Sequence, residues 1–262
     1  MTEKDYKIIP FPRARQPIVD ALRQAKRMNV MHALLEADVT DARRMVKEFR
    51  VKTGNPLSFT AFLTFCLAHA VAENKSVQAY RKGGKLVIFD DVDIAVIIER
   101  EFEGDKIPIN PFVVKAANRK TLNEIHNEIS NAKVENINKP QNSSLIDLYW
   151  YAPGFIRSLL WYLWLGSPYW RKRLTGTVGF SALGMFGKGT GWGIPISTYS
   201  LSVTMGTISQ KPALIDGKLE TREFLDLTAS FDHNVIDGAP AARFITQFKE
   251  LIESGYGLRE AA

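Results

Sequence analysis

The residues best suited to chemistry lie near the C-terminus, where the sequence reads SFDHNVIDG. His233 precedes Asp237 by four positions, and Gly238 follows directly. An imidazole titrates near neutral pH, so a histidine held in a dry site can act as a general base. Asp237 would fix the local backbone through an ion pair, and Gly238 would allow a close approach before the next helix. A hydrogen-bonded core histidine fits the same motif, and the motif alone leaves both alternatives open.

A second candidate is Ser181, in the apolar stretch GFSALGMFG. Its hydroxyl at the end of a strand, before a glycine turn, is either structural or a hydrogen-bond donor to a substrate. A serine hydrolase is disfavoured, because the nucleophile elbow G-x-S-x-G would need a glycine where Leu183 stands. The four histidines show no metal-ligand spacing with cysteine or aspartate, so the sequence predicts no metal site.

These side chains need a sheet and helices to position them. Leu225, Leu227, Ala229 and Phe231 alternate as in a half-buried strand, and the period of two places His233 on the same buried face. Apolar residues at helical spacing from 242 to 252 predict a helix packed under this strand. Strands are expected at 200–208 and 218–231, and Asp216-Gly217 predicts a hairpin turn between Ala213-Leu214-Ile215 and Leu219.

The remaining patterns predict an α+β fold with a mixed sheet and helices packed on it. Helices are expected at 18–28, 41–50, 58–73 and 122–129, and strands at 32–40 and on either side of Asp90-Asp91. No repeat or linker divides the chain, so 1–262 is interpreted as one domain. Residues 1–16 form an extended arm in this interpretation, and residues 145–173 form an aromatic-rich helical insertion.

The net charge and the cysteine content indicate which partners and which compartment suit this protein. The net charge of +6 favours an anionic partner such as a phosphate-bearing cofactor. Nucleic acid is disfavoured, because the basic residues are scattered and the aromatic residues gather elsewhere. A single cysteine, Cys66, and an N-terminus without an apolar h-region indicate a cytoplasmic protein.

The segment 145–173 is anomalous, because it holds four of the five tryptophans. Its length approaches that of a membrane-spanning helix, but Asp147, Arg157 and the Pro153-Gly154 break disfavour a span. Three alternatives stay open: a helix pair packed on the sheet or into a subunit contact, a peripheral membrane contact, or a pocket for an acyl chain.

Taken together, these motifs resemble a known family. GFSALGMFG, DLTASFDHNVIDG and AARFITQFKELIESG are similar to the catalytic core of the dihydrolipoamide acyltransferases of 2-oxoacid dehydrogenase complexes. AYRKGGKLVIFDDVD looks more like the related chloramphenicol acetyltransferases. The resemblance runs from about Arg13 to Leu258, and His233 follows Ser181 by 52 positions, as the family pattern expects.

The resemblance implies a homotrimer of the chloramphenicol-acetyltransferase-like fold, with active sites between subunits. His233 would be the general base that activates a thiol or hydroxyl acceptor toward acyl-CoA, and Ser181 would donate a hydrogen bond to the oxyanion. Asp237 would be a structural carboxylate paired with an arginine of the N-terminal arm, Arg13 or Arg15. Coenzyme A is the implied cosubstrate, and no metal is implied.

Four departures from the family affect these expectations. One is the segment 145–173, which is far more apolar than the corresponding connection in typical relatives. Asn234 stands where the dehydrogenase-complex cores usually have arginine. The chain shows no lipoyl segment, so a lipoyl group is expected only if it is supplied in trans. The tail YGLREAA is polar, which favours an isolated trimer over a cubic cage.

Overall fold

The computed structural model describes residues 6–12, 15–54, 56–97, 100–102, 105–107, 111–134, 152–182 and 189–261. The helices are α1 (Gln16–Ala25), α2 (Thr40–Thr53), α3 (Phe59–Glu73), α4 (Leu122–Val134), α6 (Gly154–Leu165), α7 (Pro168–Thr175), α8 (Gly238–Glu253) and α9 (Leu258–Ala261), with the 3-10 turns η2 (Lys75–Gln78) and η3 (Ala117–Arg119). The strands are β1 (Val30–Asp38), β2 (Tyr80–Lys82), β3 (Lys85–Val87), β4 (Ile94–Ile97), β5 (Arg100–Phe102), β6 (Asp105–Ile107), β7 (Phe112–Val114), β8 (Val178–Ala182), β9 (Leu201–Ile215) and β10 (Lys218–Asp232).

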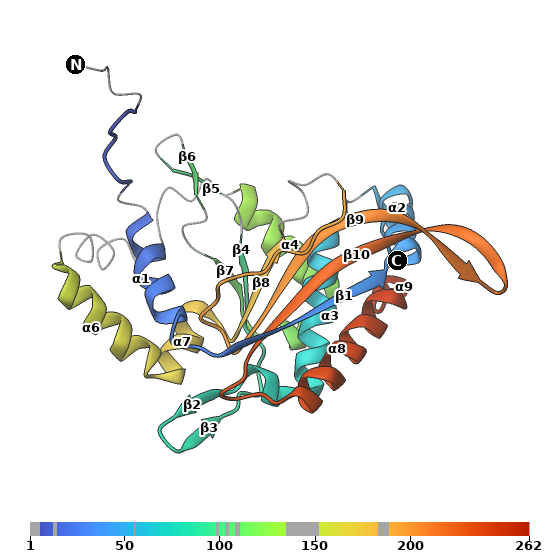
Figure 1. Cartoon of the computed structure of the whole chain (residues 1–262). Helices are drawn as coiled ribbons and strands as arrows, with labels where there is room; N and C mark the ends of the chain where they lie inside the picture. Colours follow the sequence, from blue (N-terminus) through green and yellow to red (C-terminus); the bar gives the residue numbers. More distant parts are fainter. Residues whose placement is uncertain are drawn as a thin grey trace.

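The main sheet is mixed, and within the described ranges it has six strands in the order β1-β10-β9-β8-β4-β7 (Figure 1). β8 runs parallel to both β9 and β4, whereas the other neighbouring pairs are antiparallel. The hairpins β2-β3 and β5-β6 form two small additional sheets. The predicted mixed sheet with helices packed on it is confirmed.

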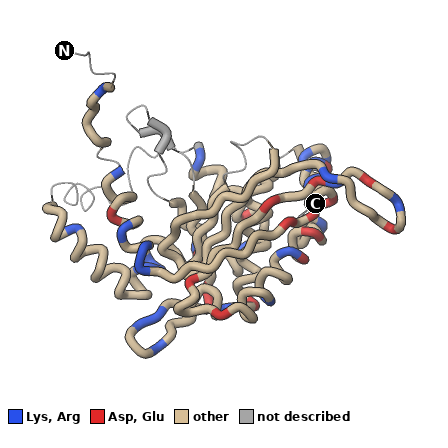
Figure 2. Tube along the Cα trace, in the orientation of Figure 1, with Lys and Arg blue, Asp and Glu red and all other residues tan. Residues whose placement is uncertain are grey.

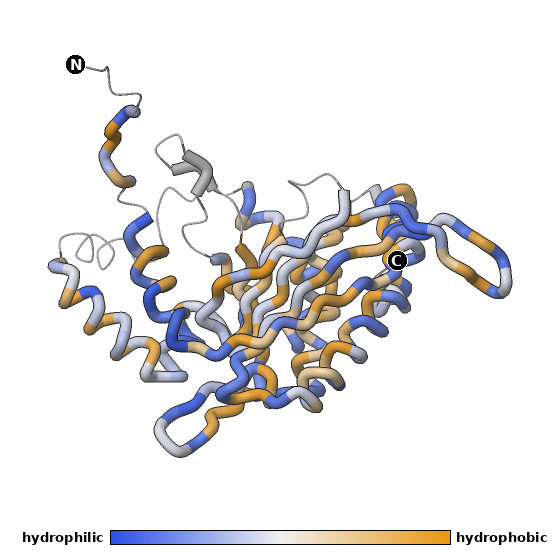
Figure 3. Tube along the Cα trace, in the orientation of Figure 1, coloured by the Kyte–Doolittle hydropathy of each residue, from blue (hydrophilic) through white to orange (hydrophobic). Residues whose placement is uncertain are grey.

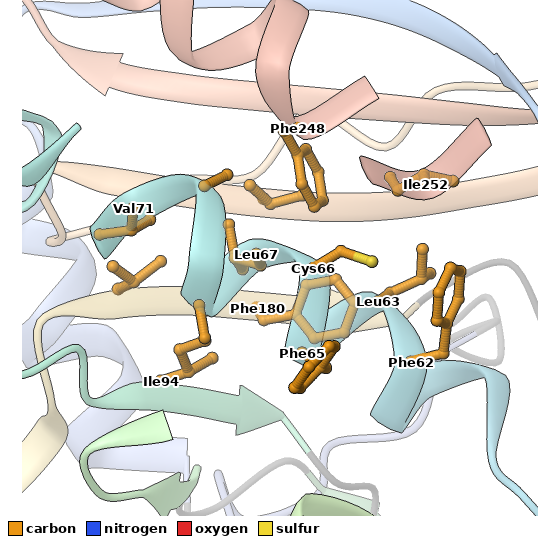
Figure 4. Close-up of a cluster of buried hydrophobic side chains, with 14 of the residues drawn as sticks. Phe62, Leu63, Phe65, Cys66, Leu67, Val71, Ile94, Phe180, Phe248 and Ile252 are labelled. Atoms are coloured by element: carbon orange, nitrogen blue, oxygen red, sulfur yellow. The ribbon is translucent and has the colours of Figure 1, made fainter. Parts of the chain in front are cut away.

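The hydrophobic core lies between one face of the sheet and helices α3, α4 and α8. α3 is apolar around most of its circumference, and ten of its residues are buried. Figure 4 shows α3 side chains packed between Ile94 and Phe180 of the sheet and Phe248 and Ile252 of α8. Cys66 is buried in this layer, and burial raises the pKa of its thiol well above the usual range.

The long hairpin β9-β10 carries the turn that the sequence predicts. Asp216 and Gly217 have φ values of 48° and 78°, which suits a two-residue turn with both central residues left-handed. The structure joins the predicted strand 200–208 to the predicted hairpin residues 213–215, because β9 runs without a break from Leu201 to Ile215. Figure 1 shows this outer part of the hairpin extending beyond the helices, so its side chains need no apolar face.

A buried carboxylate joins the sheet to α7. Asp93, 5% exposed, lies 3.2 Å from the ammonium groups of both Lys115 and Lys172, and its Oδ1 accepts a hydrogen bond from the Ala116 N–H. Lys115 also donates to the carbonyls of Lys172 and Arg173, near the C-terminal end of α7. α7 is therefore held by charge-assisted hydrogen bonds to Asp93, the residue that precedes β4.

Replacing Asp93 with alanine is expected to lower the free energy of unfolding by about 2–3 kcal/mol, because two ammonium groups and one amide lose their shared acceptor. Denaturant titration would measure the change. Asp90→Ala is the matched control: Asp90 also pairs with a lysine, Lys75 at 2.7 Å, but it is 83% exposed, and we expect no measurable change. Equal effects of the two substitutions would contradict the anchoring role of Asp93.

Candidate active site

His233 lies in the turn that follows β10, not on the strand itself. The strand ends at Asp232, and the imidazole is 53% exposed in the single chain. The prediction that His233 continues the buried face of Leu225 to Phe231 is therefore wrong for the isolated chain. Those four apolar residues are buried, but the alternation stops where the ladder with β1 stops, at the pair Val30–Asp232.

Backbone and amide hydrogen bonds fix the His233 turn. The His233 N–H donates to the Asn29 carbonyl at 2.7 Å, just before β1 begins. The Asn29 side chain donates to Oδ1 of Asn234 at 2.8 Å, and the Asn234 amide donates to Asp232 at 2.7 Å. The turn that carries the imidazole is thus tied to β1, although its side chains face solvent.

The other residues of the HNVIDG motif are open in the single chain. Asp237 is 88% exposed, and its Oδ1 lies 3.8 Å from Nδ1 of His233. Among the described residues, Asp237 pairs with His233 and not with an arginine. The predicted pairing with Arg15, the residue before α1, is therefore not seen. Arg13 lies outside the described residues. A Cβ on Gly238 would meet no atom within 4 Å, so the expected close approach does not occur inside one chain.

Ser181 lies on β8, on the face of the sheet opposite the helices. The ladder places it beside Thr204 of β9, which in turn lies beside Thr228 of β10. Ser202 and Ser230 form the next row, and His32 Nδ1 is 2.8 Å from the Ser230 hydroxyl. This face is therefore a ladder of hydroxyl groups that leads from Ser181 toward the edge strand β1.

The hydroxyl ladder was not predicted from the sequence. Within the described part of the chain, the hydroxyl groups of Ser202, Thr204 and Thr228 are buried without a hydrogen-bond partner. Buried hydroxyls usually have partners, so these three unpaired groups are unusual. The sequence does contain a signal for this ladder, because hydroxyl residues recur at a spacing of two, which places them on one face of a strand. The pairs are Ser202 with Thr204 and Thr228 with Ser230.

The two candidate catalytic residues are not brought together within one chain. Ser181 lies on β8, two strands from β10, and the ladder places it level with Thr228 of β10. His233 follows Asp232, which is four residues beyond Thr228 along β10. With a rise of about 3.3 Å per residue and about 4.8 Å between strands, the Cα atoms of Ser181 and Asp232 are about 16 Å apart. One small reacting group cannot contact both side chains of the same chain.

No cluster of three or more histidine, cysteine, aspartate or glutamate side chains that could hold a metal ion occurs among the described residues. The exposed imidazole and the half-buried hydroxyl on the strand are the groups that the arrangement offers for proton transfer and hydrogen bonding.

A family model matches most of the chain. The model of the 2-oxoacid dehydrogenases acyltransferase (catalytic domain) matches residues 3–140 and 174–258. The lipoamide acyltransferase component of the branched-chain alpha-keto acid dehydrogenase complex of Bacillus subtilis is 25% identical over 95% of this chain and 52% of its own length. The dihydrolipoyllysine-residue acetyltransferase component of the pyruvate dehydrogenase complex of Rickettsia prowazekii is 24% identical over 96% of this chain and 55% of its own. The chain spans about half the length of these curated relatives.

Solved structures share the fold. A probable dihydrolipoamide acetyltransferase from Listeria monocytogenes superposes with a TM-score of 0.73 at 22% identity, covering 96% of each chain. The dihydrolipoamide acetyltransferase of Azotobacter vinelandii has a TM-score of 0.73 at 19% identity, covering 97% of this chain and 94% of its own. That structure addressed the catalytic roles of a serine, a histidine and an asparagine, separated by 52 and 4 positions in its own numbering.

Proposed function

Because the chain belongs to the 2-oxoacid dehydrogenase acyltransferases, we propose that it transfers an acyl group between coenzyme A and a thiol or hydroxyl acceptor. One observation carries the assignment of residues. Ser181, His233 and Asp237 are separated by the same 52 and 4 positions as the serine, histidine and asparagine investigated in the Azotobacter vinelandii enzyme. Asp237 differs only in having a carboxylate where that enzyme has an amide.

The proposed chemistry uses one base and one hydrogen-bond donor. His233 takes the proton of the acceptor thiol or hydroxyl while the sulfur or oxygen attacks the carbonyl carbon of the acyl thioester. The Ser181 hydroxyl donates to the oxygen that becomes negatively charged in the tetrahedral intermediate. The intermediate then expels the thiolate of coenzyme A, which takes the proton back from the imidazolium. One acyl bond is broken and one is formed, so no metal or oxidant is required.

The separation of Ser181 and His233 supports a site shared by two copies of the chain. His233 of one copy would face Ser181 of another, which satisfies the geometry that one chain cannot satisfy. A closed ring in which each copy offers its histidine to the next gives one complete site per interface. The homotrimer that the family resemblance implies is such a ring.

We propose that coenzyme A is the cosubstrate and that a dihydrolipoyl group, if it is the acceptor, is supplied in trans. The net charge of +6 suits a cosubstrate with several phosphates.

The test is a transfer assay with a panel of acyl-CoAs, with dihydrolipoamide and simple alcohols as acceptors. Release of coenzyme A and formation of the acylated acceptor are both followed by mass spectrometry. We expect acyl transfer to at least one acceptor with wild-type protein and its loss in Ser181→Ala. Acyl transfer at the same rate in Ser181→Ala would contradict the role given to the hydroxyl.

A further inference from the structure

Helix α6 turns its apolar side chains outward. Phe155 is 74% exposed, and Leu159, Tyr162 and Leu163 are exposed as well, while none of the helix's residues is fully buried. The cation of the helix is turned the other way: Arg157 is 17% exposed and donates to Asp20 of α1 at 3.0 Å. Helices on a protein surface normally place apolar residues inward and charges outward. α6 instead exposes these apolar side chains and places Arg157 inward, beside the half-buried Trp161 and Trp164.

Neighbouring contacts hold α6 and α7 in this orientation. Arg157 ties α6 to α1 through Asp20, and Lys172 ties α7 to Asp93 at 3.2 Å. The guanidinium of Arg171 lies 3.7 Å above the ring of the buried Tyr80. These polar anchors lie on the inner side of the two helices, so rotating the apolar residues inward would break them.

α7 continues the exposed surface with aromatic residues. Tyr169 and Trp170 are both exposed, and the ammonium group of Lys82, from the β2-β3 hairpin, lies 5.1 Å from the centre of the Tyr169 ring. We name the patch formed by Phe155, Leu159, Tyr162, Leu163, Tyr169 and Trp170 the α6-α7 surface. The match to the family model omits residues 141–173, which include all of α6 and most of α7.

The charged side chains of α6 and α7 are all of one sign. The sequence contains no aspartate or glutamate between Asp147 and Asp216. Figure 2 shows the resulting pattern, with lysine and arginine on α6, α7 and the β2-β3 hairpin and no acidic residue on either helix. Arg173 and Lys82 are exposed beside the aromatic residues. Figure 3 shows that the same helices alternate hydrophobic and hydrophilic positions.

We propose that the α6-α7 surface docks on the surface of an anionic phospholipid bilayer. Exposed aromatic and aliphatic side chains beside cations, with no carboxylates, are what an interfacial helix presents to lipid. Tyrosine and tryptophan suit the boundary between headgroups and acyl chains, and each lysine or arginine near an anionic leaflet adds attraction. The described helices are too short or too polar to cross a bilayer.

A twofold contact of this surface with itself is less suitable. If the same patch met itself across a twofold axis, Lys82 and Arg173 of the two copies would be brought together without carboxylates between them. Anionic lipid headgroups supply the missing negative charge. The proposal is independent of the acyl transfer reaction, because lipid binding is measured without any substrate.

The experiment is co-sedimentation of the full chain with vesicles of phosphatidylcholine alone and of phosphatidylcholine mixed with phosphatidylglycerol in equal parts. We expect binding to the mixed vesicles, and weaker binding as salt is added, because exposed charges are screened. Replacing two exposed leucines of the surface by serine, Leu159→Ser with Leu163→Ser, is expected to lower the partition coefficient on the order of tenfold or more.

The control is a second pair of exposed leucines, Leu214 and Leu219, which face each other in the ladder of the β9-β10 hairpin. Figure 1 shows this hairpin at the end of the molecule opposite α6. Leu214→Ser with Leu219→Ser should leave vesicle binding unchanged. The proposal is overturned if wild type does not bind the mixed vesicles or if both pairs reduce binding equally. It is also overturned if the α6 pair changes the mass in solution and leaves lipid binding intact, because the surface would then be a subunit contact.

Discussion

His233→Ala is expected to lower kcat/KM for acyl transfer by about 10²–10⁴-fold, the usual contribution of a positioned general base. The imidazole is half-exposed in the single chain and makes no core contact that the fold needs. The thermal unfolding midpoint should therefore stay close to that of the wild type. The measurement is the initial rate of coenzyme A release with saturating acceptor, over a range of acyl-CoA concentrations.

Ser181→Ala provides the comparison for this result. Removal of a single oxyanion donor costs on the order of 10²–10³-fold in kcat, without changing the protonation state of the base. The pH dependence separates the two roles: the rate of Ser181→Ala should keep the pH profile of the wild type, whereas His233→Ala should lose the limb due to the base. An unchanged rate in His233→Ala would refute the mechanism.

Local patterns in the sequence predicted most of the fold elements. The alternation from Leu225 to Phe231 correctly gave a buried strand, and Asp216-Gly217 gave the hairpin turn. The continuity of β9 between Ile208 and Ala213 was missed, because Ser209, Gln210 and Lys211 show no apolar alternation. An exposed hairpin arm is held by the hydrogen bonds of its backbone ladder, so its side chains need no apolar alternation.

The site was harder to predict, because two of its features depend on where strands end and how they are ordered. A period of two does not indicate the residue at which pairing stops, so His233 was placed on a strand that ends at Asp232. The spacing of 52 residues between Ser181 and His233 gives no distance in space. That distance follows from the order β8-β9-β10 and from the ladder register, both of which arise from long-range packing.

Mixing two inactive variants is expected to restore activity. In an assembly made of His233→Ala and Ser181→Ala chains, a site that takes its histidine from a Ser181→Ala chain and its serine from a His233→Ala chain is wild type in both residues. In a trimeric ring that contains both chains, such a site occurs at about one interface in three. Co-expression with two different affinity tags and sequential purification would yield the mixed assemblies, and their rate should exceed that of either variant alone by 10-fold or more, on the order of the loss from one missing group.

The mixing experiment discriminates where the site lies, independently of what it acylates. A site contained in one chain predicts no gain on mixing, because every chain then lacks one of the two groups. A control mixture of His233→Ala with a chain carrying both substitutions should stay inactive, since none of its chains has the histidine. Restored activity in the first mixture alone would mean that His233 and Ser181 of different copies act on one acyl group, as the separation of about 16 Å within one chain requires. Activity in neither mixture, from assemblies shown to contain both chains, would contradict the shared site.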